Sequence, residues 1–85
     1  MSFSIYIPYL KVDEEDIGKN MDKFKKYQWY QAYLANESYR ELIIHNTKVR
    51  QTIGKFNNAK LSSESYAKKC QKKVHQILLN QNDNN

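Results

Sequence analysis

The segment from Ser38 to Phe56 carries the strongest helical pattern in the chain and constrains how the rest can fold. Its apolar residues recur at intervals of three and four, which places them along one face of a helix. Ser38 and Glu41 form a capping box at its start, and Gly54 stands near its end, where a left-handed residue often closes a helix. We therefore predict one helix here, with this apolar face at the centre of the core: Tyr39, Leu42, Ile43, Val49, Ile53 and Phe56.

A first helix is predicted to begin near Asp13, which is its predicted cap, and to end around Ala35 to Glu37. The acidic run from Asp13 to Asp16 complements the positive end of a helix dipole. The apolar residues that follow keep helical spacing, but after Phe24 the stripe shifts by about a quarter turn. The helix is therefore expected to bend there or to bury a wide face, formed by Ile17, Met21, Phe24, Tyr27, Tyr30 and Leu34.

A third helix is predicted to begin at Ser62, after a loop at Asn57 and Asn58. The tail that follows it, residues 80–85, contains only Asn, Gln and Asp and is predicted to be disordered. The apolar face of this helix should join the core through Tyr66, Cys70, Val74, Ile77 and Leu78.

The N-terminal residues alternate as in a β-strand. Phe3, Ile5 and Ile7 are apolar, the residues between them are not aliphatic, and Pro8 stops the run. The sequence shows no second strand, although the backbone of a strand needs hydrogen-bond partners. We expect this segment to pair with another copy of the chain, to pair with a different protein, or to lie as an extended arm over the helices.

Together these segments predict a mainly α protein: a three-helix domain with an extended N-terminal strand or arm. A chain of 85 residues has room for one domain, which we place at residues 1–79 with the arm at residues 1–12. The alternative is a long-helix coiled-coil dimer, in which residues 13–56 form one helix. Residues 35–56 also keep a strict alternation of four and three, which would place Asn46 in the coiled-coil seam.

The net charge of +5 is concentrated in one half of the chain. Between Ile44 and Asn80 there are eight basic residues and one acidic residue, Glu64. This composition suits contact with phosphate groups, anionic lipid or an acidic protein surface, and it also suits a solvated surface that keeps a protein in solution.

The sequence contains no recognisable secretory or membrane signal. The apolar run from Phe3 to Leu10 is interrupted by Pro8, has no basic residue before it, and is too short to cross a bilayer. The lone Cys70 cannot form an internal disulfide. We therefore expect a cytoplasmic protein that does not bind membranes.

Patterns typical of catalysis or metal binding are not found. His45 and His75 are the only histidines, and no CxxC, HxxxH or HExxH spacing occurs. The two glycines stand alone, so the chain has no Gly-rich phosphate-binding loop. We predict no enzymatic activity, no metal and no cofactor.

Two sets of residues are candidates for binding a partner. Trp29 and Tyr33 lie four residues apart and should point away from the stripe of Ile17, Met21 and Phe24, either exposed or covered by the third helix. Such side chains are frequent at protein-binding hot spots. With Phe3, Ile5 and Ile7 of the arm they form the predicted protein-binding surface. The third helix carries four lysines on the face opposite its apolar residues, which suits phosphate contacts and forms the alternative, a nucleic-acid-binding site: Lys68, Lys69, Lys72 and Lys73.

The run Ser4-Ile5-Tyr6-Ile7-Pro8, followed by a helix and then by Ser38 to Ile43, resembles ribbon-helix-helix DNA-binding proteins. The resemblance implies a homodimer paired through the N-terminal strand, whose outward side chains enter the major groove. The function we predict is a small non-enzymatic helical binding protein, an adaptor, inhibitor or assembly subunit with a protein partner. The alternative is a basic nucleic-acid-binding regulator that dimerises through its strand.

Overall fold

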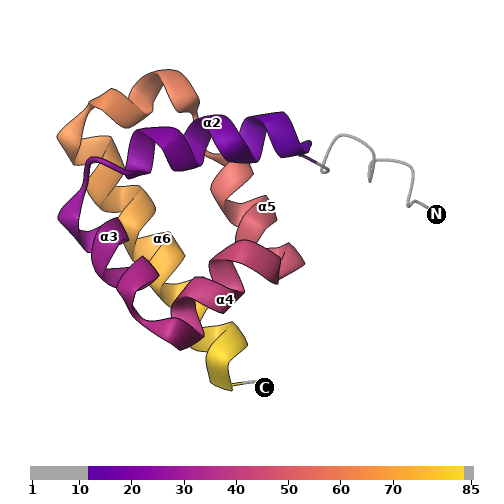
Figure 1. Ribbon diagram of the computed structural model, residues 1–85. Coiled ribbons are helices and arrows are strands. Elements are labelled where there is room, and N and C mark those ends of the chain that lie inside the picture. Colours follow the sequence, from indigo (N-terminus) through magenta and orange to yellow (C-terminus); the bar gives the residue numbers. More distant parts are fainter. Residues whose placement is uncertain (1–11, 84–85) are drawn as a thin grey trace.

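Helices account for almost all of the chain that the structure describes. The computed structural model describes residues 12–83. Within these residues there are five α-helices, one short 3₁₀ helix and no strand, so the mainly α class is confirmed and the count of three helices is wrong (Figure 1). The elements are α2 (Glu14–Phe24), α3 (Gln28–Ala35), α4 (Glu37–His45), α5 (Thr47–Lys55), η1 (Asn58–Ser62) and α6 (Glu64–Asp83).

The predicted first helix is divided into α2 and α3 at Tyr27. The backbone of Tyr27 is extended, with φ −93° and ψ 132°. Its hydroxyl donates a hydrogen bond to the Leu61 carbonyl oxygen at 2.9 Å. The break turns α3 so that the rings of Phe24 and Tyr30 meet in the core, with their centroids 5.4 Å apart. The shift in the apolar stripe therefore marks two short helices, each of which directs its own apolar face inward.

The helix predicted to begin at Ser38 begins earlier, with Asn36 as its N-cap. The Asn36 side chain accepts a hydrogen bond from the Tyr39 amide at 3.1 Å. Asn is one of the preferred N-cap residues because its side-chain oxygen satisfies an amide that has no partner within the helix. Ser38 lies inside α4, so the predicted capping box is wrong.

Asn46 divides the remainder of that predicted helix into α4 and α5. Its backbone is extended, and its side chain accepts a hydrogen bond from the Val49 amide at 3.0 Å. The coiled-coil alternative is wrong for the described chain, because it needs one helix that continues through residue 46. Asn46 is an N-cap and does not lie in a dimer seam.

The last helix begins two residues after the predicted cap. Ser62 belongs to η1. Ser63 takes the capping position, and its hydroxyl oxygen accepts a hydrogen bond from the Tyr66 amide at 3.5 Å. The distance is at the long end for such a bond, so the cap is weak.

The C-terminal end of α6 differs from the predicted disordered tail. The helix continues to Asp83, so the prediction is wrong for residues 80–83. The Asn46 side-chain nitrogen donates a hydrogen bond to Gln81 Oε1 at 3.1 Å, and Leu78 is fully buried one turn earlier. The hydrogen bond of Gln81 and the burial of Leu78 hold the last turns of α6 in place, although residues 80–83 are all polar.

The core forms where α6 meets the other helices. α6 packs against α4, α5 and η1, and α2 packs across α5 (Figure 1). The predicted inward residues Leu42, Ile43, Val49 and Ile53 are buried, which confirms the face assigned to them. The remaining buried apolar side chains are Ile17, Phe24, Tyr30, Leu61, Ala67, Cys70, Val74 and Leu78.

Gly54 has a packing role and does not end a helix as predicted. It lies inside α5 and is buried. A Cβ atom built on it would lie 2.6 Å from Val12 Cγ2 and 2.9 Å from Ile17 Cγ1, closer than carbon atoms can approach. The missing side chain therefore allows Val12, and Ile17 of α2, to approach α5 closely.

Replacing Gly54 with Ala should destabilise the fold, whereas replacing Gly18 with Ala should stabilise it. Overpacking costs about 1–3 kcal/mol, which exceeds the gain of up to about 1 kcal/mol in helix propensity. At Gly18 a Cβ would meet no atom within 4 Å, so only the propensity gain applies. Urea unfolding of both variants measures the difference. If both variants changed the free energy of unfolding by the same amount, the close approach of Val12 and Ile17 to Gly54 would be contradicted.

Candidate functional site

A shallow groove runs between α3 and α6, and we call it the α3–α6 groove. Its larger hollow, of about 380 Å³, is lined by Tyr33, Lys68, Gln71, Lys72 and His75. A smaller hollow of about 180 Å³ continues it toward the start of both helices and is lined by Tyr27, Trp29, Glu64, Ala67, Lys68 and Gln71. The two predicted residue sets, aromatic and basic, thus contribute to one surface.

Trp29 is half-buried at one end of the groove. Its ring packs edge-on against Phe24 at 5.2 Å between centroids and lies nearly parallel to Tyr27 at 5.9 Å. The sequence predicted that Trp29 points away from the stripe that contains Phe24. That prediction is wrong because the break at Tyr27 turns α3 back onto the end of α2. The indole ring therefore packs against the core residue Phe24 and also lines the smaller hollow.

Tyr33 is half-buried in the middle of the groove and partly covered by α6, which is one of the two alternatives that the sequence left open. Its ring stacks on that of His75 with centroids 6.1 Å apart, and its hydroxyl forms a hydrogen bond with His75 Nδ1 at 3.0 Å. Trp29 and Tyr39 pack edge-on against it at 5.9 Å and 5.7 Å. Burial, and after it the neighbouring Tyr39, raises the pKa of Tyr33, against a smaller lowering by a hydrogen bond from Gln71. The phenol therefore stays protonated at neutral pH and is held by contacts on three sides.

The four predicted lysines of α6 divide into two pairs. Lys68 and Lys72 line the groove. Lys69 and Lys73 are each one position further along the helix, which rotates them by about 100°. All four are exposed, and within residues 12–83 none of them forms an ion pair. Only one pair therefore shares a surface with the aromatic residues.

Gln71 and His75 complete the groove, and the sequence reasoning missed both. The signal was present, since residues 68, 71, 72 and 75 repeat at intervals of three, one and three and so share one helical face. This face is polar, so it belongs to neither the apolar pattern nor the four-lysine pattern of the helix.

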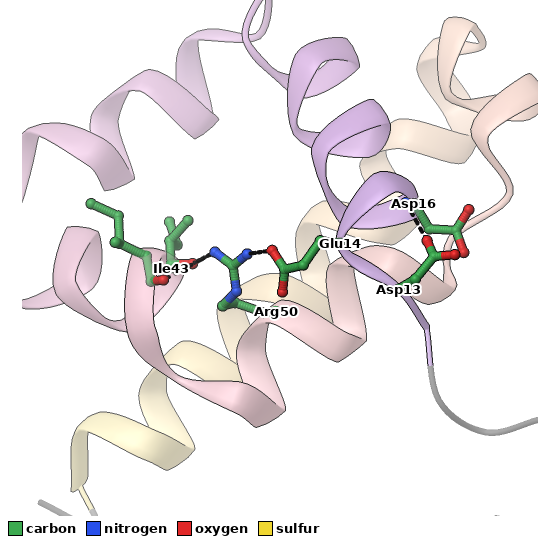
Figure 2. A network of polar contacts seen from close by, with 6 residues as sticks. Asp13, Glu14, Asp16, Ile43 and Arg50 are labelled. Atoms are coloured by element: carbon green, nitrogen blue, oxygen red, sulfur yellow. Dashed lines mark hydrogen bonds and ion pairs between the residues drawn. The ribbon is translucent and has the colours of Figure 1, made fainter. Parts of the chain in front are cut away.

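Arg50 belongs to the basic half of the chain but serves the fold. Its guanidinium donates hydrogen bonds to the carbonyl oxygens of Ile44 at 3.0 Å and Ile43 at 3.4 Å, at the C-terminal end of α4. Its other nitrogen contacts the carboxylate of Glu14 (Figure 2). A cation at this position satisfies carbonyls that have no partner within the helix. Arg50 is therefore not available as a phosphate contact.

The start of α2 is capped as the sequence predicts. The Asp13 carboxylate accepts a hydrogen bond from the Asp16 amide at 2.9 Å (Figure 2). The neighbouring acids Glu14 and Glu15 occupy the first turn, where negative charge is favourable. The acidic run is thus accounted for by helix capping.

A further hollow lies elsewhere, between α4 and the end of α6. It measures about 570 Å³ and is lined by Glu37, Ser38, Glu41, Leu42, His45, Asn46 and Asn82. No aromatic side chain lines it, and Glu41 and His45 are mostly solvent-exposed. Because exposed polar side chains of that kind are well hydrated without a partner, we take the α3–α6 groove as the candidate site.

Reactive groups in the described chain are buried or dispersed. Among residues 12–83, no group of three or more His, Cys, Asp or Glu side chains could hold a metal ion. Cys70 is buried, and burial raises the pKa of its thiol, which disfavours the nucleophilic thiolate. Burial likewise raises the pKa of Tyr30 to about 12. No helix in the described part of the chain is long and apolar enough to cross a membrane.

Three predicted site residues, Phe3, Ile5 and Ile7, lie outside the described residues. The predicted strand and its pairing therefore stay predictions. Comparisons of the chain with protein-family models, with curated proteins and with solved structures found no match. The assignment of function consequently depends on the geometry of the α3–α6 groove.

Proposed function

We propose that this chain is a small non-enzymatic binding protein, an adaptor, inhibitor or assembly subunit, that docks on a protein partner through the α3–α6 groove. The observation that carries the proposal is the position of Trp29 and Tyr33 beside Lys68 and Lys72 in one hollowed surface. Phe3, Ile5 and Ile7, predicted from the sequence, are proposed as a second contact with the same partner.

The state of the aromatic residues favours a protein partner. Trp29 and Tyr33 are already held by ring contacts and, for Tyr33, by the hydrogen bond to His75. A side chain that is immobile before binding loses little conformational entropy when a partner covers it. Trp and Tyr also bury a large area per residue, and both carry a polar group for orientation. These are the properties of residues that dominate protein–protein binding energy.

A photoreactive amino acid placed in the groove tests the proposal. We expect p-benzoylphenylalanine in place of Gln71 to crosslink the chain to a protein when it is irradiated in its native cell, because Gln71 lines both hollows. The matched control is the same replacement at Gln76, which is exposed on the same helix but outside the groove. Denaturing gels followed by mass spectrometry identify the adducts. Equal crosslinking from both positions, or none from position 71, would refute the groove as the docking site.

The second candidate function is nucleic-acid binding, and the four exposed lysines of α6 favour it. Cationic side chains that neutralise phosphates release counterions, so such binding weakens steeply with salt. Against it, Lys69 and Lys73 are turned about 100° away from the groove. Of the four lysines of α6, a strand lying along the aromatic residues would therefore contact only Lys68 and Lys72. Adducts from position 71 that disappear on nuclease treatment would support this second function and replace the first.

A further inference from the structure

We infer that the partner segment is acidic and extended, with two carboxylates two residues apart and an apolar side chain within the same five or so residues. The inference rests on the proposed function, because it specifies the partner of the same groove. Three properties of the groove carry it: the charges of its lining, the spacing of its lysines, and the position of its apolar end.

The lining of the larger hollow is positive and contains no carboxylate. Lys68 and Lys72 supply the charge, and Gln71, Tyr33 and His75 supply neutral polar groups. Lys26 lies near the other end of the groove, with its Nζ 5.3 Å from the centroid of the Tyr27 ring. Glu64 is the single carboxylate among the residues that line either hollow. An acidic segment would therefore meet complementary charge along most of its length.

The spacing of the two lysines sets the spacing of the carboxylates. Lys68 and Lys72 are one helical turn apart, about 6 Å along α6. In an extended peptide, residues two positions apart point to the same side and are separated by about 6.6 Å. Two acidic residues at positions i and i+2 can therefore reach both lysines at once, whereas adjacent acids would point to opposite sides.

The length of the groove limits the length of the segment. From Glu64 to His75 the groove follows α6 for roughly 16 Å, which an extended chain covers with about five residues. The smaller hollow, where Trp29 and Ala67 form the wall, is the apolar end. The apolar side chain of the segment is placed there, next to the indole ring, and the two carboxylates lie toward His75.

Selection from a peptide library tests this inference directly. A phage library of random 12-residue peptides is panned on the immobilised full-length chain. We expect the enriched peptides to share two acidic residues at i and i+2 and an aromatic or aliphatic residue within the same five positions. The most enriched peptide is then synthesised and titrated calorimetrically, together with a version in which its Asp and Glu are replaced by Asn and Gln. That neutral version should bind at least tenfold more weakly.

Two double charge reversals in the chain provide a matched comparison. K68E/K72E should weaken binding of the acidic peptide at least tenfold, because it reverses both charges in the groove. K69E/K73E changes the net charge by the same amount on the same helix but outside the groove, and should weaken binding less than about threefold. All four side chains are exposed, so far-UV circular dichroism should show both variants folded.

The outcomes separate failure of this inference from failure of the proposed function. Enriched peptides without acidic residues that still crosslink through position 71 would overturn the inference and leave the proposed function intact. Equal weakening by the two double variants would overturn the inference, because the attraction would then be diffuse. If no peptide is enriched and a single-stranded 20-nucleotide probe binds, both the inference and the proposed function are overturned in favour of nucleic-acid binding. If no peptide is enriched and the 20-nucleotide probe does not bind, the inference of a short acidic partner segment is overturned.

Discussion

Replacing Asn20 with Asp is expected to destabilise the fold by about 3–5 kcal/mol at neutral pH, because it places an uncompensated charge in the core. Asn20 is 1% exposed. Its side-chain nitrogen donates hydrogen bonds to the carbonyl oxygens of Ile53 at 2.7 Å and Phe56 at 3.1 Å. Its oxygen accepts a hydrogen bond from Asn58 Nδ2 at 2.8 Å. An ionised carboxylate cannot donate, so both carbonyl oxygens would face a negative charge.

The same substitution at Asn36 is the control. Asn36 is exposed, and its side chain accepts a hydrogen bond from the Tyr39 amide at the start of α4. Asp accepts equally well at an N-cap and adds favourable charge to the helix dipole. Asn36→Asp should therefore change the free energy of unfolding by less than about 0.5 kcal/mol. Urea titrations followed by circular dichroism measure both variants.

The pH dependence of the Asn20→Asp variant gives a second readout. Burial and the two facing carbonyl oxygens raise the pKa of the introduced carboxyl group in the folded state. A group with a raised folded-state pKa contributes its stability below its unfolded pKa, about 3.9, and loses it as the pH rises through the folded value. The loss in free energy of unfolding relative to the parent protein should thus become smaller as the pH is lowered toward 4. A deficit that stays constant with pH, or one that Asn36→Asp shares, would show that Asn20 does not hold the end of α5.

Leu78→Ala should cost about 2–5 kcal/mol, and Leu79→Ala less than about 1 kcal/mol. The two residues are adjacent on α6 and chemically identical, but Leu78 is fully buried and Leu79 is 41% exposed. Removing a buried side chain leaves a cavity as well as losing burial, whereas Leu79 already contacts water. A domain of this size has a total stability of only about 4–12 kcal/mol, so the Leu78 variant should melt far below the parent.

Thermal and urea unfolding of the Leu78→Ala and Leu79→Ala variants test which face of α6 packs against the core. Similar losses in the two variants would mean that α6 is rotated or that its last turns do not dock. The result also bears on the candidate site, because the packing of Leu78 and Val74 determines which face of α6 lines the α3–α6 groove. A misplaced α6 would separate Lys68 and Lys72 from Tyr33.

Local patterns in the sequence determined the helical class and the inward faces. The alternation of three and four correctly placed Leu42, Val49 and Ile53 in the core, because a helix that buries one stripe must repeat its apolar residues at that interval. Asp13 was identified as a cap for the same kind of reason: its partner, the Asp16 amide, is only three residues away. Such features depend on neighbours in the chain, so they can be read without the fold.

The tertiary structure decided where the helices break. The division at Tyr27 depends on a hydrogen bond to Leu61, 34 residues later, and no local pattern contains that information. Gly54 was interpreted as a helix end because its contact with Val12 was unknown. The sequence placed Asn46 inside a helix or in a coiled-coil seam, and its actual role as an N-cap depends on which surfaces the other helices cover.

The sequence identified most residues of the candidate site, but it did not show that they share one surface. Trp29, Tyr33 and the four lysines were identified from the sequence, and the sequence assigned them to two separate functions. Only the docking of α3 against α6 joins the aromatic residues to Lys68 and Lys72 and leaves the other two lysines outside. The physical reason is that periodicity specifies which side of a helix faces inward, whereas the neighbour it meets is set by side-chain packing between segments some 40 residues apart, such as that of Tyr33 on His75.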